Sequence, residues 1–187
     1  MGILAGAEQG GGKGAQMLGS RTVVRLLLSR RLGNLLGFLV CTGMLAFGYY
    51  LQFVVGLQPC PLCIIQRLFL AALGIAFLAA AVHHPAGRAG SVIYGGVLAL
   101  IAAGGAAVAG RHVWLQYLPP EKRPVCGPAL DYLLSAFGPI EGLRRVLRGS
   151  GECGVVDWTF LTLSIPEWTL AAFLGLLVWA VALALRD

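Results

Sequence analysis

Four long runs of apolar residues divide this chain, and each is long enough to cross a membrane as a helix. About 20 apolar residues suffice for a helix to span a hydrocarbon core of about 30 Å. Ser164 and Glu167 have the spacing of a capping box at the start of the last run. We therefore predict an all-α membrane protein, a bundle of four transmembrane helices. The expected spans cover residues 32–57, 62–82, 91–110 and 165–185.

Small residues recur at every fourth position of the third span. They are Gly95, Ala99, Ala103 and Ala107. A ridge of small residues lets a neighbouring helix approach closely in a membrane. We expect this ridge to be a packing face of the bundle.

Four spans place both ends of the chain, and the short turn after the second span, on one side of the membrane. Basic residues next to the spans usually stay in the cytoplasm. We expect residues 1–31 to form a flexible, basic cytoplasmic segment, followed by one four-helix transmembrane domain over residues 32–187. The basic residues on this side are Arg21, Arg25, Arg30, Arg31, Arg88 and Arg186.

The long loop over residues 111–164 then lies on the outer, periplasmic side. Apolar residues recur at mostly helical spacing between Ala129 and Leu147, with arginines toward the end of this stretch. Amphipathic stretches of this kind lie in the membrane interface. We expect one or two short interfacial helices, broken near Gly138 and Pro139.

The composition agrees with a membrane protein. Of the 187 residues, 58% are hydrophobic and 12% are charged, against roughly 45–50% and 25% in soluble domains. We expect the lipid bilayer, and no nucleic acid, as a partner. Trp114, Trp158 and Trp168 are placed to anchor the chain at the interface. Five cysteines allow two disulfides and one thiol, and we interpret Cys41, inside the first span, as a small buried apolar residue.

Cys60 and Cys63 form a Cys-x-x-Cys pair between the first two spans. A disulfide closing so short a loop is strained and readily exchanged. If a helix begins at Pro61, Cys63 lies at its positive end, where a thiolate is favoured, and Arg67 follows one turn later. A zinc half-site or a structural bridge is the alternative. The chain offers no second Cys-x-x-Cys pair for zinc, so we favour redox chemistry and expect no metal site.

Cys126 and Cys153 lie in the long loop, and their functions remain open at this point. A disulfide between them would stabilise the loop by roughly 3–4 kcal/mol, which is reason enough for it to exist. Flanking glycines and prolines favour an exchangeable bridge instead. Arg67 either extends to the interface or stabilises a thiolate and an oxygen-bearing ligand. His112 is either an interfacial histidine or a partner of the same ligand.

Taken together, these residues resemble the family of the bacterial disulfide bond formation protein DsbB. The resemblance covers roughly residues 32–185. Gln66 departs from it, because family members often carry a carboxylate just before the arginine. The matching features are Leu57-x-Pro59-Cys60-x-x-Cys63-Ile64-x-x-Arg67, Arg111-His112-x-x-Leu115-Gln116, Cys126, Gly151-x-Cys153 and Trp158-x-Phe160-Leu161-x-Leu163-x-x-Pro166-x-Trp168.

The resemblance implies a thiol:quinone oxidoreductase of the bacterial inner membrane that reoxidises a periplasmic, thioredoxin-fold oxidase similar to DsbA. A partner thiolate would attack the disulfide of Cys126 and Cys153 at Cys126. Cys153 would then attack Cys60, leaving Cys63 to reduce ubiquinone or menaquinone. Arg67 would stabilise charge, and His112 would line the quinone pocket.

Two other classes of protein share parts of this pattern. A vitamin K epoxide reductase-like enzyme also passes electrons between thiols and quinone, but its Cys-x-x-Cys lies in a late span. A non-enzymatic membrane protein, held by two structural disulfides or handling metal, is the other alternative. Cysteines that cycle between thiol and disulfide would distinguish the enzyme from a scaffold.

Overall fold

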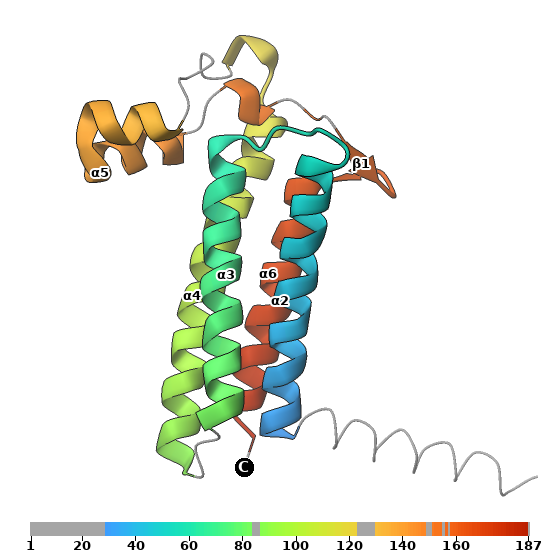
Figure 1. The fold of residues 1–187 in the computed structure, drawn as a ribbon, viewed down its shortest axis with the longest axis vertical. Helices are drawn as coiled ribbons and strands as arrows, with labels where there is room; N and C mark the ends of the chain where they lie inside the picture. The colour runs from blue at the N-terminus through green and yellow to red at the C-terminus, as the bar shows by residue number, and fades with distance from the viewer. Residues whose placement is uncertain are drawn as a thin grey trace, which may run out of the picture.

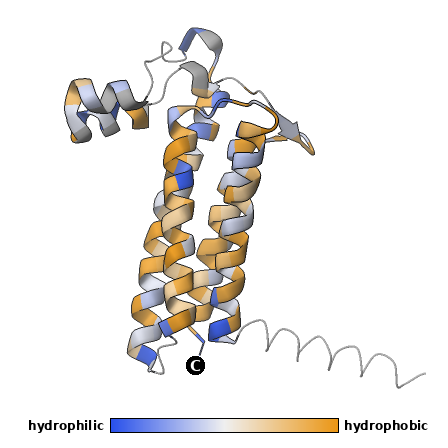
Figure 2. Cartoon of the chain, viewed as in Figure 1, coloured by the Kyte–Doolittle hydropathy of each residue, from blue (hydrophilic) through white to orange (hydrophobic). Residues whose placement is uncertain are grey.

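Four long helices run side by side as a bundle in the computed structural model (Figure 1). All four are long and apolar enough to cross a membrane, which confirms the expected four-helix membrane architecture. Figure 2 shows that hydrophobic residues dominate along their length. The helices are α2 (Arg30–Phe53), α3 (Pro61–His83), α4 (Arg88–Gln116) and α6 (Ile165–Ala184). The structure describes residues 29–83, 87–122, 130–148, 151–154, 156 and 158–186.

The starts of two helices follow from local sequence. Pro61 is the first residue of α3, a position where its missing N–H costs nothing and its fixed φ suits the helix. Ser164 caps α6, and its backbone N–H donates to Oε2 of Glu167 over 2.6 Å. The expected capping box is therefore confirmed.

The packing face of α4 differs from the predicted ridge. Gly95 is buried against Ala184 of α6, but Ala103 and Ala107 are exposed. The reason is geometric: a helix has 3.6 residues per turn, so steps of four residues drift around its axis by about 40° each. The buried face instead follows Leu98, Ala102, Gly105, Ala106 and Ala109.

Glycines on this face allow large side chains to fill the core. A Cβ on Gly105 would overlap the ring of Phe173, and a Cβ on Gly37 of α2 would lie 2.8 Å from the ring of Phe77. Both phenylalanines are fully buried. At these two places the core of the bundle, which is otherwise mainly leucine and alanine, sets an aromatic ring against a glycine.

The elements outside the bundle gather at the end that carries Cys60 (Figure 1). The α5 helix contains non-helical backbone at Gly138 (φ 76°, ψ 170°), so the expected break is confirmed there. Val146 of α5 packs against Leu62 and Val108 of the bundle. The described elements outside the bundle are η1 (Pro120–Lys122), α5 (Leu130–Arg148), η2 (Gly151–Gly154), β1 (Thr159–Phe160) and β2 (Leu163–Ser164). The two strands pair as an antiparallel hairpin.

Two expectations fall on parts of the chain outside the described residues. The basic N-terminal segment lies almost wholly within residues 1–28, and Cys126 lies within residues 123–129. The end of the bundle opposite Cys60 holds the start of α2 and the end of α6. There, Nη2 of Arg30 donates to the carbonyl oxygen of Arg186 over 2.8 Å.

Candidate functional site

The two sulfurs of the Cys-x-x-Cys pair lie together at the start of α3. Cys60 is the residue before the helix, and its Sγ is 3.3 Å from Sγ of Cys63. The backbone N–H of Cys63 points at Sγ of Cys60 over 3.4 Å. The expected helix start at Pro61 therefore brings both sulfurs to the positive end of the helix, which favours thiolate chemistry.

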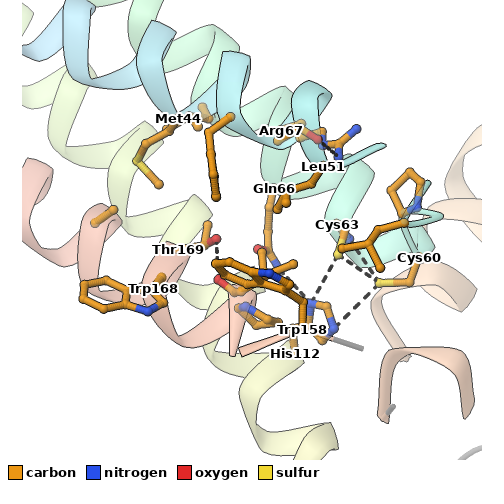
Figure 3. A pocket seen from close by; sticks show the side chains of 18 of the residues that line it. Met44, Leu51, Cys60, Cys63, Gln66, Arg67, His112, Trp158, Trp168 and Thr169 are labelled. Atoms are coloured by element: carbon orange, nitrogen blue, oxygen red, sulfur yellow. Dashed lines mark hydrogen bonds between the residues drawn. The ribbon is translucent and has the colours of Figure 1, made fainter. Parts of the chain in front are cut away.

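His112 lies beside this pair, inside a helix instead of in a loop. We expected the third span to end at residue 110, but α4 continues to Gln116. His112 is consequently only 3% exposed. Its Nε2 is 3.7 Å from Sγ of Cys60, and its Nδ1 is 4.0 Å from Sγ of Cys63 (Figure 3).

The sequence carried a signal for this longer helix. No glycine or proline follows Gly110 before Pro119, so nothing in the chain stops the helix sooner. Val108, His112 and Leu115 also recur at the spacing of one helical face, and all three are buried. His112 therefore faces the interior of the protein instead of its surface.

Gln66 is a residue of this site that was not predicted from the sequence, where it stood out only as a departure from the family pattern. It lies three positions after Cys63, on the same face of α3. Its side chain is only 4% exposed, and its Nε2 is 3.0 Å from Nδ1 of His112. Gln66 therefore belongs to the buried polar groups around the sulfurs.

Arg67 is held by α2. One of its Nη atoms donates to the side-chain oxygen of Gln52, and the other donates to the carbonyl oxygen of Gly48 over 3.0 Å. Its guanidinium also lies over the ring of Tyr49, 5.1 Å from the centroid. These contacts satisfy a cation that would be costly in an apolar span without partners.

Cys153 approaches the same place from the long loop. It lies in η2 and is only 1% exposed, packed against Leu62 and Leu115. Its Sγ, Sγ of Cys60 and a ring nitrogen of His112 all lie within 4.8 Å of one another. The structure thus brings together four of the six predicted site residues, namely Cys60, Cys63, His112 and Cys153.

A cavity of about 980 Å³ opens beside these sulfurs. Cys60, Cys63, Arg67 and His112 all line it, and its walls are mainly apolar. Figure 3 shows Met44 and Leu51 of α2, and Thr169 of α6, around the same space. The cavity therefore lies among the membrane-spanning helices, where a lipid-soluble molecule can enter.

Aromatic rings form one wall of the cavity. Phe47, Trp158, Phe160 and Trp168 all line it. The ring of Trp158 stacks on Phe160 with centroids 6.1 Å apart and meets the edge of Phe47 at 5.9 Å. We expected Trp158 and Trp168 to act as membrane anchors; the structure also places both in the wall of this cavity, which their sequence positions alone do not indicate.

Comparison with known proteins shows the family to which the chain belongs. The family model of the disulfide bond formation protein DsbB matches residues 30–183. Curated relatives called disulfide bond formation protein B include one from Xanthomonas axonopodis pv. citri, 51% identical over 79% of this chain and 86% of the relative. Others come from Methylococcus capsulatus, 51% identical over 80% and 91%, and Hahella chejuensis, 48% identical over 83% and 94%.

These matches extend over the whole helical bundle. They therefore decide between the DsbB family and the vitamin K epoxide reductase-like enzymes, the two enzyme classes that the sequence resembles. The vitamin K epoxide reductase-like alternative is set aside, because the matching model covers all four spans and both ends of the long loop. The chain belongs to the DsbB family, and it is a multi-pass membrane disulfide oxidoreductase that acts in disulfide bond formation.

Proposed function

We propose that this protein reoxidises a periplasmic, thioredoxin-fold oxidase similar to DsbA and passes the electrons to a quinone in the bacterial inner membrane. The proposal rests on one observation. Sγ of Cys60 lies 3.3 Å from Sγ of Cys63 and within 4.8 Å of Sγ of Cys153, on the wall of a large cavity. Such an arrangement suits a relay of two disulfide exchanges.

In the first exchange, a thiolate of the partner attacks Cys126 in its disulfide with Cys153. A partner–Cys126 disulfide forms, and Cys153 leaves as a thiolate with the electron pair. In the second, Cys153 attacks Cys60, the Cys60–Cys63 disulfide breaks, and Cys63 leaves as a thiolate. The proximity of Cys153 to Cys60 supports this second step, because exchange requires direct attack of one sulfur on another.

The cavity fits a quinone by its chemistry. Its apolar and aromatic walls suit a flat ring with a long apolar tail, and a few polar groups converge on them. When bound, ubiquinone or menaquinone supplies an acceptor for two electrons and two protons. Arg67 has five N–H donors, of which its bonds to Gln52 and Gly48 use two. Arg67 can therefore donate to a quinone oxygen while α2 holds it.

His112 contributes to the same site in a different way. It lines the cavity, but its ring nitrogens face Cys60, Cys63 and Gln66. We assign its ring to the wall of the quinone site and its nitrogens to the sulfurs. Cys63, the sulfur that ends the relay, lines the same cavity and lies 4.0 Å from Nδ1 of His112.

The orientation of the chain follows from the same proposal. Arg30, Arg88 and Arg186 lie at the bundle end opposite Cys60, and basic flanks favour the cytoplasm. Both termini, with the basic segment over residues 1–31, are then cytoplasmic. The cysteine end of the single transmembrane domain over residues 32–187 is periplasmic, where disulfides persist.

Trapping the partner tests the relay. Purified Cys153→Ser protein is mixed with the reduced partner and examined on non-reducing gels and by peptide mapping. We expect a stable partner adduct at Cys126, because the sulfur that would continue the relay is gone. Cys41→Ala is the matched control: Cys41 is buried in α2, away from the cavity lining, so it should turn over without accumulating an adduct.

A second candidate, a metal-handling membrane protein, draws on one observation. Cys60, His112 and Cys153 offer three ligand atoms within 4.8 Å, although zinc usually takes four ligands and requires both cysteines to be reduced. Stoichiometric zinc that stays with the reduced protein through gel filtration, with no partner turnover, would support this candidate. Turnover by protein that retains no zinc would support the relay.

A further inference from the structure

Gln66 makes a buried contact for which the relay itself gives no reason. Its side-chain Nε2 lies 3.0 Å from Nδ1 of His112, and both side chains are nearly inaccessible to solvent. A polar pair at this depth is kept only where each atom has a suitable partner. With Nε2 of Gln66 turned toward Nδ1 of His112, the amide is the donor in this contact and the imidazole is the acceptor.

The chemistry of the amide decides the direction of this hydrogen bond. The NH2 group of a glutamine side chain can donate but cannot accept. Nδ1 of His112 must then accept, so it carries no proton. A neutral imidazole has one N–H, which consequently lies on Nε2. Nε2 is the nitrogen that lies 3.7 Å from Sγ of Cys60.

That N–H faces the sulfur that Cys153 attacks in the proposed relay. Sγ of Cys60, Sγ of Cys153 and a ring nitrogen of His112 lie within 4.8 Å of one another. Thiolates are the species that attack and leave in disulfide exchange. A buried anion requires a donor, and the opposite tautomer would instead present the lone pair of Nε2 to Sγ of Cys60.

We propose that Gln66 is a positioning residue, which holds the proton of His112 on Nε2 and so directs the single N–H of the ring at Sγ of Cys60, the atom that Cys153 attacks. This inference rests on the proposed relay. In the step concerned, the Cys153 thiolate attacks Sγ of Cys60 and forms a Cys153–Cys60 disulfide. The Cys60–Cys63 bond breaks, and Cys63 leaves with the electron pair. His112 keeps its proton throughout.

Two substitutions separate this function from simple packing. Gln66→Met has nearly the same shape but offers no donor to Nδ1. Gln66→Glu keeps the shape and reverses the bond, because a carboxylate accepts a hydrogen bond and favours a proton on Nδ1. Packing alone would treat the two variants alike, whereas tautomer control predicts different imidazoles.

The imidazole can be observed directly by NMR. The chain has three histidines, so His83→Gln and His84→Gln leave His112 as the one histidine of 15N-histidine-labelled protein in micelles. Protonated and unprotonated ring nitrogens have well-separated 15N shifts. We expect an unprotonated Nδ1 and a protonated Nε2 with Gln66, a mixture of tautomers in Gln66→Met, and a protonated Nδ1 in Gln66→Glu. A protonated Nδ1 with Gln66, or the same pattern in all three proteins, would overturn the inference.

A rate measurement links the tautomer to the relay. In quinone-free protein mixed with reduced partner, formation of the Cys153–Cys60 disulfide is followed by acid quenching and mapping. We expect Gln66→Met to slow this step roughly tenfold, the rate equivalent of one hydrogen bond. Adduct formation at Cys126 should keep its rate and show that the variant is folded.

Failure of this inference and failure of the proposed function would look different. If the protein carrying Gln66 turns over with partner and quinone, but Gln66→Met exchanges at the same rate, the inference is wrong and the relay stands. If the tautomer responds to Gln66 as expected while the cysteines never cycle, the relay is wrong, and so is the assignment of the His112 tautomer to disulfide exchange.

Discussion

Arg67 of α3 donates a hydrogen bond to the carbonyl oxygen of Gly48 in α2, over 3.0 Å. The carbonyl of a helix interior is already an acceptor for its own helix, so this second bond links the two helices at the level of the cavity. Gln52, one turn further along α2, holds the same guanidinium. These two bonds hold the guanidinium of Arg67 in one place on the cavity wall. An arginine side chain that extended to the membrane interface would not be held in this way.

Replacing Arg67 with Met should weaken the use of quinone selectively. A hydrogen bond from a charged group contributes about 1.5–3 kcal/mol, so we expect the KM for quinone to rise by about 10- to 150-fold. Steady-state kinetics with varied quinone measure this effect. The rate of adduct formation with the partner at Cys126 should stay unchanged; an unaltered KM would show that Arg67 serves only to join α2 and α3.

Replacing Trp158 with Ala should also raise the KM for quinone, because the ring forms part of the aromatic wall. Loss of one stacked aromatic contact is worth about 0.5–1.5 kcal/mol beyond its buried area, so the rise should be several-fold. Trp114→Ala is the matched control. Trp114 is exposed and lies over Arg111, outside the cavity lining. Equal effects of the two substitutions would point to general membrane anchoring.

Replacing Cys63 with Ser should abolish quinone reduction and leave a Cys60–Cys153 disulfide. In this variant the Cys60 thiolate attacks Cys153 in its proposed disulfide with Cys126, that bond breaks, and Cys126 leaves as a thiolate. The sulfurs of Cys60 and Cys153 lie within 4.8 Å, and Cys60 loses its original partner in this variant. Peptide mapping under non-reducing conditions identifies the bond. Quinone reduction that persists in Cys63→Ser would exclude Cys63 as the end of the relay.

Replacing Gly105 with Ala should destabilise the bundle without touching the site. The added methyl group would overlap the buried ring of Phe173, and such overpacking costs about 1–3 kcal/mol. Gly96→Ala is the control, because nothing lies within 4 Å of the position of its Cβ. That variant should be as stable as the parent or up to about 1 kcal/mol more stable, since alanine favours a helix over glycine. Unfolding in mixed detergent micelles compares the two.

The sequence was sufficient for much of this architecture, because apolar run length directly reflects the thickness of the bilayer. The capping box at Ser164 and the break at Gly138 were also predictable, because each depends on residue types at neighbouring positions in the chain. The packing face of α4 was not, since strict four-residue spacing ignores the drift around the helix that exposes Ala103 and Ala107.

The site was predictable only in part. Cys60, Cys63 and Cys153 are recognised by residue type and spacing. Their convergence with His112 depends on α4 continuing past residue 110, which places His112 on the buried face of the helix. Gln66 gives no comparable signal. Its contact with the imidazole of His112 depends on how α3 packs against α4, which the residue type alone does not indicate. The anchoring of Arg67 by the Gly48 carbonyl depends on the register of α2 against α3, which no local pattern encodes.

This protein should transfer electrons from the dithiol of a partner to quinone. The ratio of quinol formed to partner disulfide formed can be measured. Purified protein is titrated anaerobically with reduced thioredoxin-fold partner and ubiquinone or menaquinone, while partner thiols and quinol are followed together. We predict one quinol for each partner disulfide formed, and no quinol with Cys153→Ser. Quinol formed at the same rate by Cys153→Ser, or partner thiols lost without quinol, would contradict the relay.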